Sequence, residues 1–318
     1  MYGVRGKYES PRIAVQTSTI RIQIGLNTRR SRHRGPGDQP LYFRPRTLSA
    51  ALEALASRPS QILSGGTDFF PALGDRPLTT PVVDITGLTE FKGISVDSDQ
   101  VCIGGLTTWT EVITAALPRC FDALKRAARE VGSVQIQNRG TVAGNLCNAS
   151  PAADGVPPLL ALDAEVELIS LAGTRRISLA DFIVGNRSTL RRPDEILAHV
   201  FVPRRLDNAA STFIKLGARR YLVISISMVA TIVAVDKTGR VAEARIAVGS
   251  CSAKALRLRE LENALVGVPA GSGLAAAVVR EHLAKLCPID DVRATAAYRN
   301  DATLTLVKRS LDACVGSC

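Results

Sequence analysis

The chain has few of the residues that build metal centres. Its 318 residues include only three histidines. No two of its seven cysteines form a Cys-x-x-Cys pair: Cys102, Cys120, Cys147, Cys251, Cys287, Cys314 and Cys318. Iron–sulfur clusters and structural zinc sites need closely spaced thiolate or imidazole ligands. The sequence therefore predicts no metal centre in this chain, and the scattered cysteines favour reduced thiols over a disulfide framework.

Long apolar runs are also missing. The longest one, residues 222–235, contains two serines and is too short to span a bilayer. Residues 1–40 contain no apolar segment of the length that a secretory signal requires. We therefore expect neither a membrane span nor export, and we predict a cytoplasmic location.

Aromatic residues make up only 4% of the chain, which bears on the meaning of its positive charge. The formal net charge is +11, and residues 1–40 contribute +6 of it, from eight Lys/Arg against two acids. A nucleic-acid-binding surface usually interleaves basic and aromatic residues, and that pattern is absent. Such a segment could be a transit peptide, a nucleic-acid arm or residues translated upstream of the true start. We predict that residues 1–39 are a basic, disordered extension without a catalytic role, and we expect no nucleic-acid partner.

The chain does contain two segments rich in glycine and small polar residues. The first is Ile62-Leu63-Ser64-Gly65-Gly66-Thr67-Asp68-Phe69, and the second is GTVAGNLCNASPAAD over residues 140–154. Small side chains let a backbone approach a ligand closely, and turns after strands present N–H groups to phosphate oxygens. Two such segments can converge on one large anionic ligand, and a flavin dinucleotide is the first candidate.

Hydrophobic periodicity predicts short strands and helices in alternation up to about residue 205. Strands are expected at 62–64, 82–85, 101–103, 166–171 and 196–202. Helices are expected at 47–55, 109–117, 120–131 and 157–162. Thr108 is a candidate N-cap for the second of these helices. Asp154 either binds a ligand ribose hydroxyl or caps the helix at 157–162, and its position alone leaves both readings open.

The polar segment 203–208 is the best internal boundary, because the pattern changes after it. Strands are expected first, at 213–216, 222–235 and 241–248. Helices follow, at 255–265, 273–286 and 295–313. Strands grouped before helices indicate an α+β layer with an antiparallel sheet.

Taken together, the two glycine segments resemble the FAD-binding medium subunits of molybdenum hydroxylases, the family of xanthine dehydrogenase, carbon monoxide dehydrogenase and nicotinate or aromatic hydroxylases. Further similarity lies in Lys-Leu-Gly-Ala-Arg at 215–219 and in PIDDVRATAAYR at 288–299. The resemblance covers roughly residues 40–315. It implies an α+β protein with a two-part FAD-binding domain of the PCMH, or vanillyl-alcohol-oxidase-like, type at 40–205 and a small α+β C-terminal domain at 211–315.

The resemblance also implies FAD as the cofactor and assigns residues to it. The two glycine segments would hold the pyrophosphate, Asp154 would bind toward the adenosine end, and Val131, Leu197 and Lys215 match further contact positions. The implied cofactor-binding residues are Ile62, Leu63, Ser64, Gly65, Gly66, Thr67, Asp68, Phe69, Thr108, Thr141, Val142, Ala143, Gly144, Asn145, Asp154, Leu197 and Lys215. No catalytic residue and no metal ligand is predicted.

Three positions depart from the family's pattern. Ala143 stands where glycine is usual, and it still leaves little side chain near a ligand. Trp109 stands where histidine is frequent, so a polar or covalent role of that position is not carried over. Val223 stands where many members have an acid, so any contact made by that carboxylate is absent here.

The implied function is that of an electron-transfer subunit. In the family, a large subunit with the molybdenum cofactor hydroxylates the substrate, a small [2Fe-2S] subunit relays electrons, and FAD in the medium subunit passes them to NAD⁺ or another acceptor. We predict the same role and the same partners for this chain, in which the cofactor supplies the redox chemistry. The alternative is a stand-alone FAD-dependent oxidoreductase of the same fold, which would need its own substrate pocket and catalytic side chains.

Overall fold

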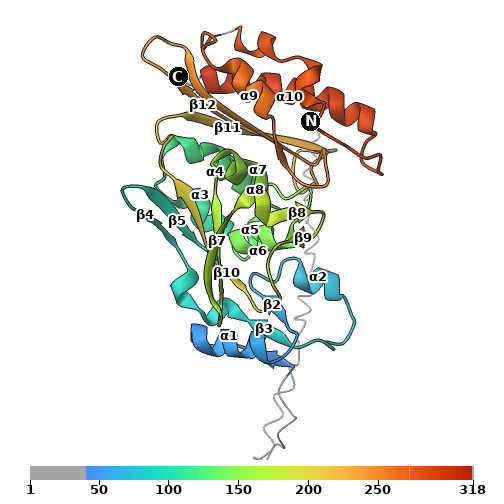
Figure 1. Ribbon diagram of the computed structural model, residues 1–318. Helices are drawn as coiled ribbons and strands as arrows, with labels where there is room; N and C mark the ends of the chain where they lie inside the picture. The colour runs from blue at the N-terminus through green and yellow to red at the C-terminus, as the bar shows by residue number, and fades with distance from the viewer. Residues whose placement is uncertain (1–40, 272, 317–318) are drawn as a thin grey trace, which may run out of the picture. The chain divides into compact units, whose positions relative to one another are not determined.

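The computed structural model describes residues 41–271 and 273–316 (Figure 1). The predicted basic extension at 1–39 lies outside these residues. The described residues belong to a single compact unit. The division into domains at 40–205 and 211–315 therefore stays a prediction.

A small parallel sheet carries the first glycine segment. Its strands lie in the order β1 (Tyr42–Phe43), β3 (Val82–Asp84) and β2 (Gln61–Leu63). Helix α1 (Leu48–Ser57) begins where the Thr47 side chain accepts a hydrogen bond from the N–H of Ala50, and it packs its apolar face on this sheet. The glycine segment follows β2 and leads into helix α2 (Phe69–Leu73). The predicted strand before the first glycine turn is confirmed.

A second, antiparallel sheet supports the main hydrophobic core. Its strands lie in the order β4 (Ile94–Val96), β5 (Gln100–Gly104), β10 (Ile196–Pro203), β6 (Glu165–Ser170) and β7 (Gly173–Ser178). Alternate residues such as Val101, Ile103 and Val200 point into this core. Two 3-10 turns, η1 (Ile85–Gly87) and η2 (Thr89–Phe91), connect β3 to β4, and the hairpin β8 (Ile183–Gly185) and β9 (Ser188–Thr189) precedes β10.

The helices between β5 and β6 carry the second glycine segment. They are α3 (Trp109–Thr114), η3 (Arg119–Phe121), α4 (Asp122–Glu130), α5 (Val134–Gln137), α6 (Val142–Asn148) and α7 (Val156–Ala161), and α8 (Leu179–Phe182) follows β7. Thr108 forms a capping box with Glu111 at the start of α3. The amphipathic face predicted at 120–131 is buried in α4. The helices expected at 109–117, 120–131 and 157–162 are confirmed, with shifts at their ends.

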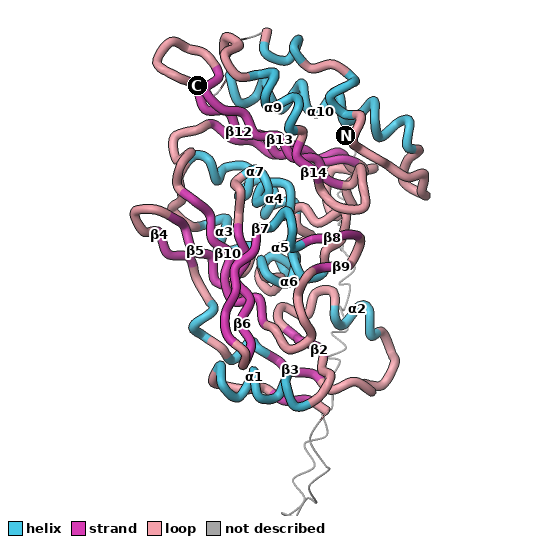
Figure 2. The backbone as a smooth tube through the Cα atoms, in the orientation of Figure 1, coloured by secondary structure: helices cyan, strands magenta, loops and turns pink. Residues whose placement is uncertain are grey.

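The last sheet is buried on both faces. It consists of the antiparallel strands β11 (Ala210–Leu216), β12 (Ser227–Val235), β13 (Val241–Gly249) and β14 (Leu256–Arg257). Met228 and Ile232 point into the main core, whereas Val229 and Val233 point into a second core beneath helix α10 (Ala296–Val315). Figure 2 shows this sheet between α4 and α7 on one side and α9 (Arg259–Leu265) and α10 on the other. Burial on both faces explains the nearly continuous apolar sequence of β12.

Two predictions for this region are wrong. Residues 222–226 form a loop rather than the start of a strand, and Leu222 has a φ of +52°. Residues 273–286 form two 3-10 turns, η4 (Leu274–Ala277) and η5 (Arg280–Leu283), rather than one helix. Val278 and Val279 separate these turns in extended conformation, which β-branched side chains favour over helix.

The helix predicted at 255–265 begins later than expected, because residues 256–257 pair with β13 as β14. The helix predicted at 295–313 is confirmed, and the Thr295 side chain accepts a hydrogen bond from the N–H of Tyr298 at its start. Across 41–271 and 273–316, no helix has both the length and the apolar composition needed to cross a bilayer. The described part of the chain contains six cysteines, of which Cys120, Cys251 and Cys314 are buried.

Candidate functional site

The two glycine segments meet in space. The hydroxyl oxygens of Ser64 and Thr141 lie 3.2 Å apart. Gly65 lies so close to Arg139 that a Cβ at Gly65 would approach the Arg139 carbonyl oxygen to 2.1 Å. Gly66 has a φ of +75°, which favours glycine. The predicted convergence of the segments is confirmed, and it depends on glycine at both positions of the first turn.

A cavity of about 860 Å³ opens where the segments meet. Its size lies toward the upper end of the range for small-molecule and cofactor sites, roughly 300–1,000 Å³. Most of the residues that the sequence assigned to the cofactor line this cavity: Ile62, Ser64, Gly65, Gly66, Thr67, Asp68, Phe69, Thr141, Ala143, Gly144, Asn145, Asp154, Leu197 and Lys215. Val131 lines it as well.

Three of the assigned residues do not line the cavity. Leu63 and Val142 are buried side chains of the supporting core. The Thr108 hydroxyl donates to the Glu111 carboxylate over 2.7 Å and accepts from the Glu111 N–H, so it caps α3. These residues shape the elements on which the cavity is built.

The two glycine segments differ in their backbone N–H groups. In the second segment, the N–H groups of Val142, Ala143 and Gly144 donate to Thr107, Gly105 and the Thr141 hydroxyl, respectively. In the first segment, the N–H groups of Gly65, Gly66 and Thr67 have no acceptor among the described residues. The first segment therefore offers free N–H donors to the cavity, whereas the N–H groups of residues 142–144 are already used within the protein.

A buried ion pair forms part of that wall. Asp154 accepts hydrogen bonds of 2.7 Å from the Lys215 ammonium at one carboxylate oxygen and of 2.7 Å from the Ser225 hydroxyl at the other. Burial raises the pKa of Asp154, and Lys215 and Ser225 partly offset this effect. Lys215 also donates to the carbonyl of Glu130 over 3.3 Å. Its side chain is only 7% exposed, although a lysine at a strand end is ordinarily solvated.

The structure excludes one of the two interpretations of Asp154. The residue before α7 is Gly155, and no side chain makes a capping hydrogen bond there. The capping interpretation is therefore wrong, and the carboxylate instead faces the cavity.

The cavity also contains an unpaired acceptor. The Oδ1 atom of Asn145 is buried and has no hydrogen-bond partner in the described part of the chain. A buried acceptor without a donor is costly, so it fits a ligand that supplies an N–H or O–H group. A flavin dinucleotide fits this set of groups. They are the free N–H groups, the glycines that exclude a Cβ, the unpaired Asn145 acceptor and the apolar walls from Leu197 and Val131.

The lining residues that the sequence did not assign to the cofactor include two arginines and an apolar loop. Arg187 and Arg191 come from the hairpin β8–β9 and its exit, and the Nη1 of Arg187 donates to the Asn148 amide oxygen over 2.6 Å. Leu222, Val223 and Ile224 come from the loop between β11 and β12. The arginines carry no sequence signal for a ligand, and the apolar loop has the composition of a strand.

Trp109 is buried, with 1% of its surface exposed, and its ring also contributes to the cavity wall. A Cβ at Gly155 would approach this ring to 2.3 Å. Trp109 is thus a core aromatic, and Gly155 makes room for it.

Two family models match the chain. The FAD binding domain in molybdopterin dehydrogenase matches residues 33–205, and the CO dehydrogenase flavoprotein C-terminal domain matches residues 212–314. The chain is 37% identical over 236 residues to the nicotinate dehydrogenase FAD-subunit of Eubacterium barkeri, covering 72% of this chain and 80% of that protein. It is 31% identical over 283 residues to the putative xanthine dehydrogenase FAD-binding subunit of Escherichia coli K12, covering 87% and 96%.

Solved structures agree with these sequence matches. Quinoline 2-oxidoreductase from Pseudomonas putida 86 superposes with a TM-score of 0.81 at 25% identity, covering 87% of this chain and 96% of that one. The carbon monoxide dehydrogenase from Hydrogenophaga pseudoflava superposes with a TM-score of 0.77 at 26% identity, covering 87% and 97%.

The family models and the relatives identify a flavoprotein whose cofactor is FAD. More closely, the chain belongs to the family of FAD-binding medium subunits of molybdenum hydroxylases, as in xanthine dehydrogenase and carbon monoxide dehydrogenase, and it is an oxidoreductase subunit. The predicted α+β fold is confirmed: an FAD-binding domain of this family precedes a carbon monoxide dehydrogenase flavoprotein type C-terminal domain.

Proposed function

We propose that this chain transfers electrons within a molybdenum hydroxylase complex. It would receive them from the iron–sulfur clusters of a small [2Fe-2S] subunit, which are reduced by a large subunit with the molybdenum cofactor, and deliver them to NAD⁺ or another acceptor. Relatives named as subunits or medium chains, such as the carbon monoxide dehydrogenase medium chain of Hydrogenophaga pseudoflava, support this proposal. A cytoplasmic location belongs to the same proposal.

The observation that carries the proposal is the division of polar groups in the cavity. The groups without protein partners are binding groups, namely the N–H groups of Gly65, Gly66 and Thr67 and the Asn145 carbonyl oxygen. The lining ion pair, Asp154 with Lys215, is internally neutralised. No histidine lies among the described residues that line the cavity, and the described part of the chain holds no group of three metal-ligating side chains.

According to this division, the chain binds and orients FAD and does not itself carry out the redox step. The N–H groups of the first turn would hold the pyrophosphate, and Asp154, held in place by Lys215 and Ser225, would contact hydroxyls toward the adenosine end. Leu197 and Val131 would exclude water from the bound ring system. FAD itself supplies the redox chemistry that connects one-electron carriers with a two-electron acceptor.

The test is to purify the chain both alone and with its natural partners. We expect two further chains, molybdenum and iron to co-purify with it, and only the complex to reduce the flavin with a hydroxylation substrate. A Gly66→Asp variant of the complex should keep its molybdenum and iron but lose FAD and acceptor reduction, because a charged side chain would meet the phosphate site. Direct reduction of the isolated chain's flavin by a small substrate, as fast as in a complex, would favour the stand-alone oxidoreductase.

A further inference from the structure

The loop at 217–226 forms part of the cavity wall, and its residues before Ser225 are not buried. Its residues Leu222, Val223 and Ile224 line the cavity. Leu222 and Ile224 are 56% and 52% exposed, and Leu222 has the unfavourable φ of +52°. Burial therefore does not hold Leu222 and Ile224. Within the loop, the Arg219 guanidinium donates to the carbonyls of Tyr221 and Leu222, and the C-terminal end of the loop is anchored at the buried Ser225 and Ile226.

The C-terminal end of the loop is fixed by three hydrogen bonds. The Ser225 hydroxyl donates to Asp154 over 2.7 Å, and the Ile226 N–H donates to the Leu216 carbonyl over 2.7 Å. The Ile226 carbonyl accepts a 2.6 Å hydrogen bond from the Nη1 of Arg299. The last contact comes from α10, an element that contributes no lining residue to the cavity.

Arg299 is itself held in one orientation. Its Nη2 donates to the Asp291 carboxylate over 2.7 Å, and its Nη1 also donates to the Ser250 carbonyl over 3.1 Å. The residue is 3% exposed, and its Nε has no partner among the described residues. The Asp291 oxygen also accepts from the N–H groups of Arg293 and Ala294, over 2.8 and 3.2 Å. A guanidinium that bonds a carboxylate and a carbonyl at once has a geometry that an ammonium group does not reproduce.

We propose that Arg299 is a positioning residue for the FAD site. It acts through the Ile226 carbonyl, which fixes the end of the 217–226 loop and thereby the Ser225–Asp154 hydrogen bond and the apolar wall at 222–224. The segment 288–299 would then support the cavity wall, because its Asp291 holds Arg299 and Arg299 holds the Ile226 carbonyl. The proposal depends on this cavity being the FAD site.

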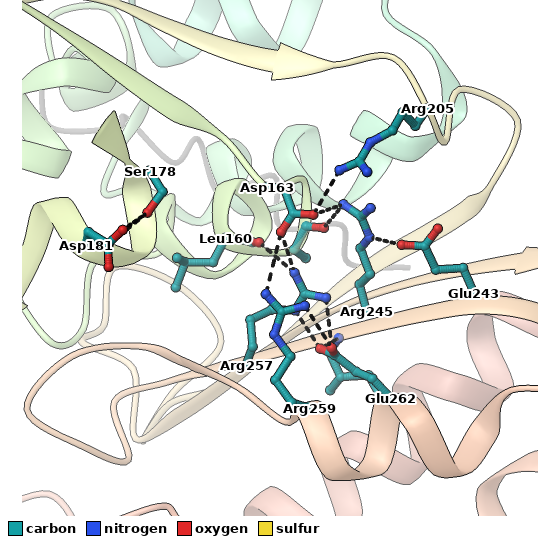
Figure 3. A network of polar contacts seen from close by, with 12 residues as sticks. Leu160, Asp163, Ser178, Asp181, Arg205, Glu243, Arg245, Arg257, Arg259 and Glu262 are labelled. Atoms are coloured by element: carbon teal, nitrogen blue, oxygen red, sulfur yellow. Dashed lines mark hydrogen bonds and ion pairs between the residues drawn. The ribbon is translucent and has the colours of Figure 1, made fainter. Parts of the chain in front are cut away.

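The test uses Arg299→Lys in the full chain, with Arg245→Lys as the matched control. Both arginines are 3% exposed, and each bonds a carboxylate and a main-chain carbonyl, but Arg245 pairs with Asp163 and Glu243 and does not contact the loop (Figure 3). We expect Arg299→Lys to weaken FAD binding about 10-fold, to change the visible circular dichroism of the flavin, and to speed amide exchange selectively at 217–226. Arg245→Lys should lower the melting temperature without these three changes.

A double-mutant cycle separates positioning from general destabilisation. If Arg299 acts through Ser225 and Asp154, Ser225→Ala will weaken FAD binding, and adding Arg299→Lys will weaken it little further. Fully additive effects, or FAD affinity and loop exchange that are unchanged in Arg299→Lys, would overturn the proposal. Should Arg299→Lys fail to fold, Asp291→Asn, which keeps the Ile226 contact, must give the same loop-specific exchange at smaller amplitude. A wild-type chain that binds no FAD would refute the site itself instead.

Discussion

The two carboxylates that flank helix α7 have different surroundings, a cavity for one and a cluster of arginines for the other. Asp154 precedes the helix and lines the cavity, with Lys215 and Ser225 as its partners. Asp163 follows the helix and forms ion pairs with four arginines, Arg205, Arg245, Arg257 and Arg259 (Figure 3). Helix α7 thus connects a ligand site at one end to a structural cluster at the other.

The Asp163 cluster joins α7 to the last sheet. Arg245 on β13 donates to the Ala161 carbonyl over 3.2 Å, and Arg257 on β14 donates to the Leu160 carbonyl over 3.1 Å. Cations that bond the last carbonyls of a helix are stabilising, because these carbonyls carry partial negative charge. Arg257 also donates a hydrogen bond to the Glu262 carboxylate. The other oxygen of this carboxylate accepts a hydrogen bond of 2.8 Å from the N–H of Ile246.

The two ends differ in how completely their polar groups are paired. The buried guanidinium groups of Arg245 and Arg257 bond both carboxylates and carbonyls. At the cavity end, the Asn145 side chain has an unpaired oxygen. Positive φ does not separate the ends, because it occurs at Ala149 and Leu222 and also at Asp163. Unpaired polar groups are typical of binding sites, whereas complete pairing is typical of a structural joint.

The largest effect on stability is expected from Asp163→Ala. Arg245 and Arg257, whose side chains are 4% and 7% exposed, would lose this carboxylate. We expect the free energy of unfolding to fall by about 3 kcal/mol while the FAD dissociation constant of the folded protein is unchanged. Chemical denaturation and FAD titration measure the two quantities.

The control for this variant is Glu243→Ala, which removes the 45% exposed partner of Arg245. It should cost less than about 1 kcal/mol, because exposed ion pairs contribute little. An Asp163→Ala protein that loses FAD affinity in proportion to stability would show that the two ends of α7 are not separable.

Gly65→Ala should lower FAD affinity more than stability, which is the reverse of the result expected for Asp163→Ala. The added Cβ would lie 2.1 Å from the Arg139 carbonyl oxygen, and the backbone must shift to relieve the clash. We expect FAD affinity to fall by about 100-fold or more, which corresponds to about 2.7 kcal/mol, with a smaller change in stability. Flavin content of the purified protein and FAD titration provide the measurement.

Gly185→Ala is the matched control, because a Cβ at Gly185 meets no atom within 4 Å. It should bind FAD like the unmodified chain. Full flavin content in Gly65→Ala would show that the first glycine turn is not part of the FAD site.

Acidification should affect stability through Asp291. The N–H of Arg293 and the Arg299 guanidinium lower its pKa from the ordinary 3.8 to about 2. Because the folded-state pKa is the lower one, this contribution to stability is complete above pH 3.8 and is lost as the pH falls toward 2. Asp291 is 25% exposed, so solvent screening limits the effect to about 1 kcal/mol.

Denaturation of Asp291→Asn between pH 2.5 and 5 should show a flatter slope than the unmodified chain. Asp154 changes the free energy of unfolding with pH in the opposite direction. Because burial raises its pKa, acidification favours the folded state through this group. An identical slope in Asp291→Asn would mean that its hydrogen bonds do not persist in solution.

The smallest effect is a spectroscopic one. Trp109 is the only tryptophan and lines the cavity, so FAD binding should quench its fluorescence. Asp163→Ala should leave the quenching intact, whereas Gly65→Ala should shift it to higher FAD concentration. Unchanged emission at saturating FAD would show that the flavin binds away from Trp109.

Local patterns predicted most of the elements. Thr47, Thr108 and Thr295 cap the helices expected after them, because a cap requires only a hydroxyl next to free N–H groups. The two glycine turns were also visible in the sequence. The errors fall where local signals conflict: residues 222–226 have the apolar composition of a strand, and residues 274–283 have alanines that favour a helix but valines that interrupt it.

The sequence by itself determined the two glycine segments, since only residues without a side chain allow the first turn to touch Arg139, and it determined the cofactor through the family that these segments define. The tertiary structure decided how Asp154, Lys215 and Ser225 meet, and which of two nearby carboxylates faces the cavity. The contacts of Asp154 with Lys215 and Ser225 join residues 61 and 71 positions apart. Such pairings are set by how the last sheet packs on α7, and no local pattern records them.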